Sequence, residues 1–348
     1  MPESVTTKLT LDIEAIVNDI LATIERERER EIISRRFGLF DRKETLEQIG
    51  ELLGITRERV RQLEKSVMSR LKVEAEKGEL PHIAQIAVSL TEVVKRLGGV
   101  ARTADISAEL TTDNTKFDQA RVAFLAQLCT PLAVVEDNDH FFHAVGLTEL
   151  HNEKEIKEHV AQIVDAIKKL GEPTTIDLIA KNAGHNDPHH VRALASVSKQ
   201  LATLNSHWGL IRWPMVNPKN IRDKIYVILK DHGKHMHFNE IATAIKGSSF
   251  KRKDVTTQAI HNELIKDKRF VLIGRGIYAL KEWGYEKGTV ADIITSVLRE
   301  AGEPLHRDEI VKRVLKSRYV KETTILLNLQ GKPQFKRVAK ATYALNEK

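Results

Sequence analysis

Five polar residues recur at helical spacing within residues 57–65, and their side chains could read DNA bases. At 100° per residue, Arg57, Glu58, Arg61, Gln62 and Lys65 fall on one arc of a helix. Arginine pairs bidentately with guanine, glutamine pairs with adenine, and a carboxylate accepts from the amino group of cytosine. A salt-bridged surface helix is the alternative interpretation, because Glu58 and Gln62, like Arg61 and Lys65, are i,i+4 neighbours.

Two short helices joined by a tight turn are expected to position these side chains. Thr45 and Gln48 form the capping-box pattern at the start of the first helix, and Gly54 ends that helix. Thr56 caps the second helix. The apolar residues of the second helix recur opposite the polar arc, at Val60, Leu63, Val67 and Leu71. This order predicts a helix-turn-helix.

A longer segment around this pair carries a family resemblance. Residues 28–72, "REREIISRRFGLFDRKETLEQIGELLGITRERVRQLEKSVMSRLK", closely resemble the fourth conserved region of vegetative-type (sigma-70 family) bacterial sigma factors. The motifs that carry it are "RRFGL" at 35–39 and "TLEQIGELLGITRERVRQLE" at 45–64. The resemblance implies that this region reads the −35 promoter element and grips the flap of the RNA polymerase β subunit.

The resemblance also assigns roles to individual residues. It implies that Arg57, Glu58, Arg61 and Gln62 face base edges. The residues expected near DNA phosphates are Arg35, Arg36, Thr45, Arg59 and Lys65. The preceding "LDIEAIVNDILATIERE" would be the first helix of the same domain, with its apolar residues, Leu11, Ile16 and Ile20 or Leu21, directed inward.

The resemblance covers residues 11–75, about a fifth of the chain. The aromatic and basic residues with which a sigma factor captures a melted strand have no counterpart in it. We therefore expect that this chain does not start transcription alone.

Internal repetition organises the remainder of the chain. "GEPTTIDLIAKNAG" at 171–184 recurs as "GEPLHRDEIVKRVL" at 302–315, and "DKRFVLIGRGIYAL" at 267–280 parallels "KPQFKRVAKATYAL" at 332–345. Each copy contains three helices followed by a β-hairpin. This order predicts the winged-helix variant of the helix-turn-helix. The expected domains are a degenerate first copy at 81–148, a second at 154–214, a third at 219–284 and a fourth at 287–347. The fold class is therefore mainly α with small β-hairpin wings.

The last two copies resemble the HARE-HTH family, winged helices found in the RNA polymerase δ subunit and in chromatin-associated proteins. "HFNEIATAI" with "GRGIYAL", and "GEPLHRDEIVKRVL" with "ATYAL", carry this resemblance. It implies a role with nucleic acid or with RNA polymerase. The family supplies no fixed set of base-reading residues. The third copy has four extra residues, which "GSSF" at 247–250 could supply.

Charge separates the copies. Residues 219–286 and 287–348 each carry a net charge of +6, whereas residues 81–150 are net acidic, with Glu136, Asp137 and Asp139 at the wing tip of the first copy. Basic patches attract nucleic acid through counterion release, and a solvated basic surface is the alternative. The candidate secondary contacts are Lys251, Arg252, Lys253, Lys268, Arg269 and Arg275 in the third copy and Arg318, Lys321, Lys336 and Arg337 in the fourth. We expect the acidic first copy to contact protein or act as a spacer.

Other chemistry is not expected. The single Cys129 excludes a disulfide framework, and the histidines of "HNDPHH" at 185–190 and "HGKHMHF" at 232–238 read as loop residues, so neither a metal nor a cofactor is expected. "ERERERE" at 25–31 reads as a solvated helix face. No catalytic motif stands out, and we expect no enzyme. With no apolar run long enough to span a membrane, the protein is expected in the cytoplasm, at the nucleoid.

Two functions are the leading candidates, and a third, an enzyme subunit of a restriction-like system, rests only on the HARE-HTH resemblance. The first is a DNA-binding transcription regulator that reads a −35-like sequence in double-stranded DNA, docks on the polymerase β flap, or does both. The second is an accessory or architectural subunit of RNA polymerase that does not read sequence.

Overall fold

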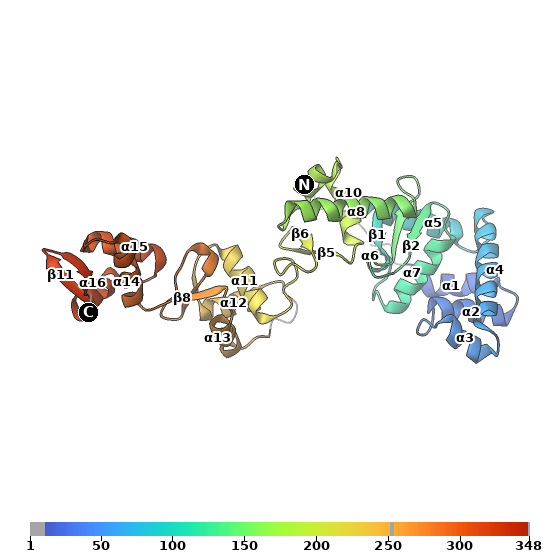
Figure 1. The fold of residues 1–348 in the computed structure, drawn as a ribbon. Helices are drawn as coiled ribbons and strands as arrows, with labels where there is room; N and C mark the ends of the chain where they lie inside the picture. Colours follow the sequence, from blue (N-terminus) through green and yellow to red (C-terminus); the bar gives the residue numbers. More distant parts are fainter. Residues whose placement is uncertain (1–10, 251–253, 347–348) are drawn as a thin grey trace, which may run out of the picture. The chain divides into compact units, whose positions relative to one another are not determined.

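A computed structural model describes residues 11–250 and 254–346 (Figure 1). The chain divides into two compact units, residues 1–212 and 213–348. The described residues are mostly helical and contain four small antiparallel sheets of three strands each. Each of these helices is too short or too polar to cross a lipid bilayer.

Four N-terminal helices open the first unit: α1 (Ile13–Ala22), α2 (Glu27–Phe37), α3 (Leu46–Leu53) and α4 (Arg57–Glu76). The predicted caps are confirmed. Thr45 and Gln48 form a complete capping box at α3, and Gly54 ends this helix with a φ of 64°. Thr56 caps α4 by accepting from the Arg59 amide. The sequence therefore predicted the start and end of α3 and the start of α4.

The helix α1 packs into a core that includes α2 and α4 and also extends beyond the N-terminal helices. Ile16, Ile20 and Leu21 are all buried, and they share one apolar core with residues of the first copy such as Phe124. A separate small core lies between α2, α3 and the start of α4, and its buried members are Ile32, Ile49 and Val60. The N-terminal helices and the first copy therefore fold around a common core.

The first copy consists of α5 (Ile83–Arg96), β1 (Val100–Arg102), α6 (Thr103–Leu110), α7 (Lys116–Leu128), β2 (Leu132–Val135) and β3 (Ala144–Leu147). The sheet order is β1-β3-β2. Its helix α7 packs against α1 and α4 (Figure 1). The first copy is thus the support on which the N-terminal helices rest.

The second copy repeats this order with α8 (Glu153–Leu170), β4 (Thr174–Thr175), α9 (Ile176–Ala183), α10 (Pro188–Ser196), β5 (Leu201–Leu204) and β6 (His207–Leu210). The acidic wing tip of the first copy contacts it. Phe141 pairs with Ser198 in an isolated β-bridge, and Lys199 Nζ lies 2.9 Å from Asp137 Oδ1. At least part of the acidic tip therefore makes a protein contact, within the chain itself.

The second unit holds the remaining two copies. The third consists of α11 (Ile221–His232), β7 (Met236–His237), α12 (Phe238–Gly247), α13 (Thr257–Lys266), β8 (Phe270–Gly274), β9 (Ile277–Leu280) and the 3-10 helix η1 (Lys281–Trp283). The fourth consists of α14 (Val290–Ala301), β10 (Leu305–His306), α15 (Arg307–Ser317), α16 (Glu322–Gly331), β11 (Phe335–Ala339) and β12 (Thr342–Leu345).

The hairpins of these two copies have the same register. Leu272 pairs with Tyr278 in the third copy, and Arg337 pairs with Tyr343 in the fourth. Each sheet also contains a two-residue strand between its first two helices, which the sequence analysis did not anticipate. The element order recurs in all four copies. The winged-helix assignment and the HARE-HTH relationship stay predictions.

Candidate nucleic-acid interface

The turn between α3 and α4 brings two backbone segments into close contact. A Cβ atom added at Gly50 would lie 2.7 Å from the carbonyl oxygen of Ile55, so only glycine fits there without a shift of the backbone. The Ile55 amide donates to the Gly50 carbonyl at 2.9 Å. These contacts fix the angle at which α4 leaves the turn.

The inner face of α4 divides between two cores. Val60 packs in the small core with Ile32 and Ile49, while Val67 and Leu71 pack in the core shared with the first copy. The predicted inward side of this helix is confirmed, with Leu63 partly buried. Because both halves of α4 are anchored, its remaining face is held in a fixed orientation.

The opposite face carries the five polar residues that the sequence placed together, and we call them the outer arc: Arg57, Glu58, Arg61, Gln62 and Lys65. All five are exposed. Arg61 forms a two-pronged ion pair with Glu58, with Nε to Oε2 at 2.9 Å and Nη2 to Oε1 at 2.6 Å. Gln62 donates more weakly to the same carboxylate, at 3.4 Å.

This pairing sets the charge state of the outer arc. The hydrogen bond from Arg61 is the largest influence that lowers the pKa of Glu58, and the same bond raises the pKa of Arg61. Both groups are therefore ionised at neutral pH. Glu58 can turn its carboxylate toward cytosine, or it can hold the Arg61 guanidinium in position for a base. Exposed ion pairs are weak, so either arrangement is accessible.

The residues expected near phosphates fall into two sets. Thr45, Arg59 and Lys65 are exposed. Arg35 and Arg36 are half-buried and form ion pairs: Arg35 Nε lies 3.0 Å from Glu31 Oε1 and its Nη1 lies 2.9 Å from Glu44 Oε1, while Arg36 Nε lies 3.3 Å from Glu64. These two arginines help to hold the helices together, and their phosphate role stays a prediction.

The helix α2 is more engaged than its alternating charges indicated. Glu29 is buried and forms ion pairs with Arg26 at 3.3 Å and with Arg70 of α4 at 3.0 Å. The interpretation of residues 25–31 as a solvated helix face is therefore wrong at Glu29. Its side chain ties α2 to the middle of α4.

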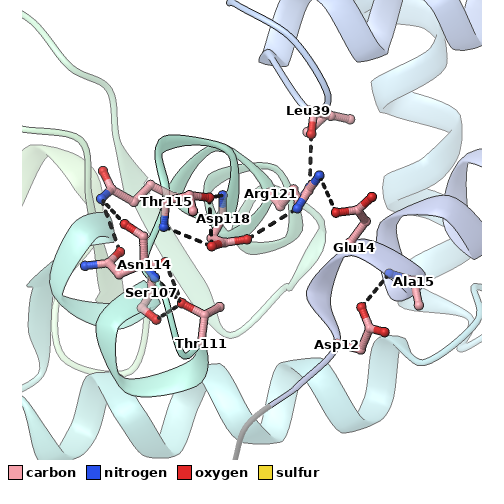
Figure 2. Close-up of polar contacts among 11 residues, drawn as sticks. Asp12, Glu14, Ala15, Leu39, Ser107, Thr111, Asn114, Thr115, Asp118 and Arg121 are labelled. Carbon is pink, nitrogen blue, oxygen red and sulfur yellow. Dashed lines mark hydrogen bonds and ion pairs between the residues drawn. The ribbon is translucent and has the colours of Figure 1, made fainter.

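A buried arginine that the sequence analysis missed joins these helices to the first copy. Arg121 of α7 donates from Nε to the Leu39 carbonyl at 3.0 Å, and its Nη2 lies 2.8 Å from Glu14 of α1 (Figure 2). Asp118 lies 3.3 Å from Nη1, and the Phe40 ring lies beneath the guanidinium. A charged residue directly before the apolar "VAFLAQL" was the signal that could have identified it.

The basic residues of the second unit are not equivalent. Lys268, Arg275, Lys321, Lys336 and Arg337 are exposed. Lys251, Arg252 and Lys253 lie outside the described residues.

Two arginines expected as secondary contacts make internal contacts instead. Arg269 pairs with Asp267 at 2.7 Å and with Asp223 at 3.1 Å, and it lies over the Tyr226 ring. Arg318 donates to the Leu272 carbonyl of the third copy, and burial lowers its pKa. A contact of these two arginines with nucleic acid stays a prediction.

Comparisons with known proteins match the N-terminal helices. The family model for sigma-70, region 4 matches residues 26–73. A segment of 74 residues is 42% identical to the RNA polymerase sigma factor sigB of Arabidopsis thaliana, covering 20% of this chain and 13% of that protein. A segment of 63 residues is 44% identical to the RNA polymerase sigma factor RpoD of Helicobacter pylori, covering 18% of this chain and 9% of that protein.

A third relative is also an RNA polymerase sigma factor. A segment of 57 residues is 44% identical to the RNA polymerase sigma factor SigA of a Bacillus species, covering 16% of this chain and 15% of that protein. The chain therefore spans only a small part of the length of these relatives. The family match includes α2, α3 and nearly all of α4, and it leaves out α1 and the four copies.

Proposed function

We propose that this chain is a DNA-binding transcription regulator of the sigma-factor-related type, which acts in the cytoplasm at the nucleoid. It reads a −35-like promoter sequence, docks on the β flap of RNA polymerase, or does both. The outer arc carries this proposal, because its exposed side chains lie on a well-anchored helix inside the segment that matches sigma-70 region 4. We assign no promoter melting to this chain.

The chemistry of base reading follows from the outer arc. A bidentate contact to a base discriminates by about 1–3 kcal/mol, which exceeds the worth of an exposed ion pair. Guanine can therefore displace Glu58 from Arg61, and the freed carboxylate can accept from a neighbouring cytosine. Thr45 and Arg59 lie beside this face and supply phosphate contacts that fix the register.

The four copies extend this surface in the proposal. We interpret each as a winged helix, and the last two as HARE-HTH-like. The exposed cations Lys268, Arg275, Lys321, Lys336 and Arg337 support salt-sensitive contacts with DNA that carry no sequence information.

Binding of the full-length chain to two duplexes tests the proposal. One duplex contains a −35-like element and the other has the same composition in scrambled order. The triple variant Arg57→Ala, Glu58→Ala, Arg61→Ala should lose the preference for the first duplex, while binding to the scrambled duplex persists and weakens with salt. Fluorescence anisotropy at two salt concentrations measures both quantities.

A matched control removes the same charges elsewhere. On α8, Lys154 and Glu158 are exposed and Lys157 is partly exposed, and their replacement by alanine also deletes two cations and one carboxylate. This control should keep the preference. If the outer-arc variant also keeps it, the base-reading proposal is wrong.

A second function is supported by one observation. Much of the outer arc has partners without DNA, since Glu58 holds Arg61 and Gln62 accepts from Arg59 at 3.4 Å. This arrangement favours an accessory subunit of RNA polymerase that does not read sequence. Such a subunit would co-purify with core polymerase through a high-salt wash and would leave no footprint on promoter DNA. A footprint over the −35 region that the triple variant loses would exclude this function.

A further inference from the structure

Four histidines that are distant in the sequence meet where the first and second copies join. We call His151, His159, His185 and His190 the histidine cluster. The His151 ring centroid lies 4.4 Å from that of His159 and 5.0 Å from that of His190, and the His159 and His185 rings are 5.1 Å apart. His151 precedes α8, His159 lies on α8, His185 lies between α9 and α10, and His190 lies on α10.

The hydrogen bonds show which ring nitrogens carry hydrogen when the cluster is neutral. His190 Nδ1 lies 2.6 Å from the Gly98 carbonyl, so this nitrogen must carry hydrogen and Nε2 of the same ring is left as an acceptor. His151 Nε2 lies 2.9 Å from that acceptor and therefore donates to it. His159 Nδ1 and His185 Nε2 are buried and have no hydrogen-bond partner in the described part of the chain. Two imidazole nitrogens are thus left unsatisfied.

The cluster sits against a backbone contact between the two copies. A Cβ atom at Gly98 would lie 2.9 Å from the Ala193 side chain, and one at Gly99 would lie 2.5 Å from the Leu150 side chain. His189 of α10 also lies 3.2 Å from the Arg96 carbonyl. The helix α10 therefore rests directly on residues 96–99, and His190 is part of that contact.

The surroundings oppose positive charge on these rings. Burial is the largest influence that lowers the pKa of His151, followed by His159 and His190, and Glu155 acts in the opposite direction. Burial and then the charges of His159 and His190 lower the pKa of His185. Residues 96–99 contribute backbone carbonyls, and Glu155 is engaged at the start of α8, where it accepts from the Asn152 amide at 2.8 Å.

We propose that the histidine cluster is a proton-operated latch between the first and second copies. When the rings are neutral, His190 holds α10 on residues 96–99. When the cluster takes up protons, several positively charged rings lie in contact with one another. Their repulsion loosens α10 from Gly98 and Gly99. The latch therefore opens as the pH falls below the ordinary range of histidine, about 6.5.

The arrangement of the rings favours protons over a metal ion. The described residues contain no group of three or more His, Cys, Asp and Glu side chains with the geometry to hold a metal. The 2.9 Å between His151 and His190 is a hydrogen-bond distance. Two nitrogens bound to one tetrahedral ion would lie farther apart, at about 3.3 Å.

Hydrogen–deuterium exchange of the full-length chain at pH 7.5 and 5.5 tests the latch. Exchange rates are first corrected for the intrinsic effect of pH. Amides within 94–100 and 188–196 should then exchange at least about tenfold faster at the lower pH. A tenfold change corresponds to a difference of one pKa unit between the closed and open states of the latch. The variant His159→Gln, His185→Gln replaces two rings of the cluster by neutral amides, and its response should shrink to about twofold or less. The control His232→Gln, an exposed histidine outside the cluster, should keep the full response.

Three results would overturn the proposal. The first is an equal response to pH in the wild-type chain and the double variant. The second is a response at constant pH that requires Zn²⁺ and disappears with EDTA, which would make the cluster a metal site. The third comes from the wild-type chain alone and does not depend on the folding of the variants: a histidine NMR titration in which none of the cluster rings titrates below its ordinary range.

Discussion

Arg121 Nε donates to the main-chain carbonyl of Leu39, which precedes it by 82 positions in the chain, at a distance of 3.0 Å. The same guanidinium contacts Glu14 and Asp118 while it is almost fully buried. One side chain therefore joins α7, α1 and the loop after α2. Leu39 ends the motif "RRFGL", but Arg121 belongs to no motif, so the sequence alone did not indicate that the two would meet.

Replacement of Arg121 by alanine should destabilise the first unit by about 2–3 kcal/mol, because it leaves a buried carbonyl without its charged donor. Urea denaturation followed by circular dichroism measures the free energy of unfolding. Arg299→Ala removes an exposed arginine from α14 and should change this free energy by less than about 0.5 kcal/mol. Equal effects of the two substitutions would show that Arg121 does not clamp these helices.

The substitution Glu58→Gln separates the two roles that the structure allows for this carboxylate. If Glu58 accepts from cytosine, the preference at one base pair should relax by about 1–3 kcal/mol while the other positions are unchanged. If it orients Arg61, the preference should instead relax at the position that Arg61 contacts. Binding to a panel of single-base variants of the duplex distinguishes the two. Glu153→Gln on α8 is the control and should alter neither.

The stability of the first unit should fall as the pH is lowered from 7.5 to 5.5. His151 and His185 have lowered pKa values in the folded chain, so the unfolded chain binds protons at a higher pH than the folded chain does. The stability that their neutral forms contribute is complete above about pH 6.5 and is lost as the pH falls through the folded values.

Urea denaturation at a series of pH values checks this sign. Carboxylates titrate mostly below this window, so they contribute little to the change. The variant His151→Gln, His185→Gln should show a flatter profile than the wild-type chain. A wild-type stability that is constant or rises toward pH 5.5 would contradict the prediction.

Gly50→Ala should weaken DNA binding by tilting α4. Its Cβ would meet the Ile55 carbonyl oxygen at 2.7 Å, and relief of that contact requires the turn to open, at a cost of about 1–3 kcal/mol. Gly247 at the end of α12 has open space around an added Cβ, so Gly247→Ala is the matched control and should be neutral or stabilising. Thermal unfolding and duplex binding report the two effects separately.

Local patterns predicted what depends on neighbouring residues. Caps at Thr45 and Thr56, the end of α3 at Gly54 and the two faces of α4 all follow from spacing over a few positions, and the structure confirms them. The recurrence of hairpins in the last two copies was also visible, because Tyr278 and Tyr343 hold equivalent places in register.

Contacts over long sequence separations could not be predicted in this way. The pairing of Glu29 with Arg70 spans 41 positions, and that of Arg121 with Leu39 spans 82. His151 and His159 gave no indication that they would meet His185 and His190, because each pair lies in a different segment of the copy. The two-residue strands such as β7 escaped notice because so short a run has no periodicity.

The common core of the N-terminal helices and the first copy has a consequence for modularity. Val67 and Leu71, on the last turns of α4, pack against side chains such as Phe124 that lie far outside the sigma-like segment. A fragment cut after residue 76 would therefore expose apolar side chains of α1 and α4, and the compact unit that contains this segment extends to Arg212. The segment that resembles sigma factors therefore ends before the folded core that it belongs to.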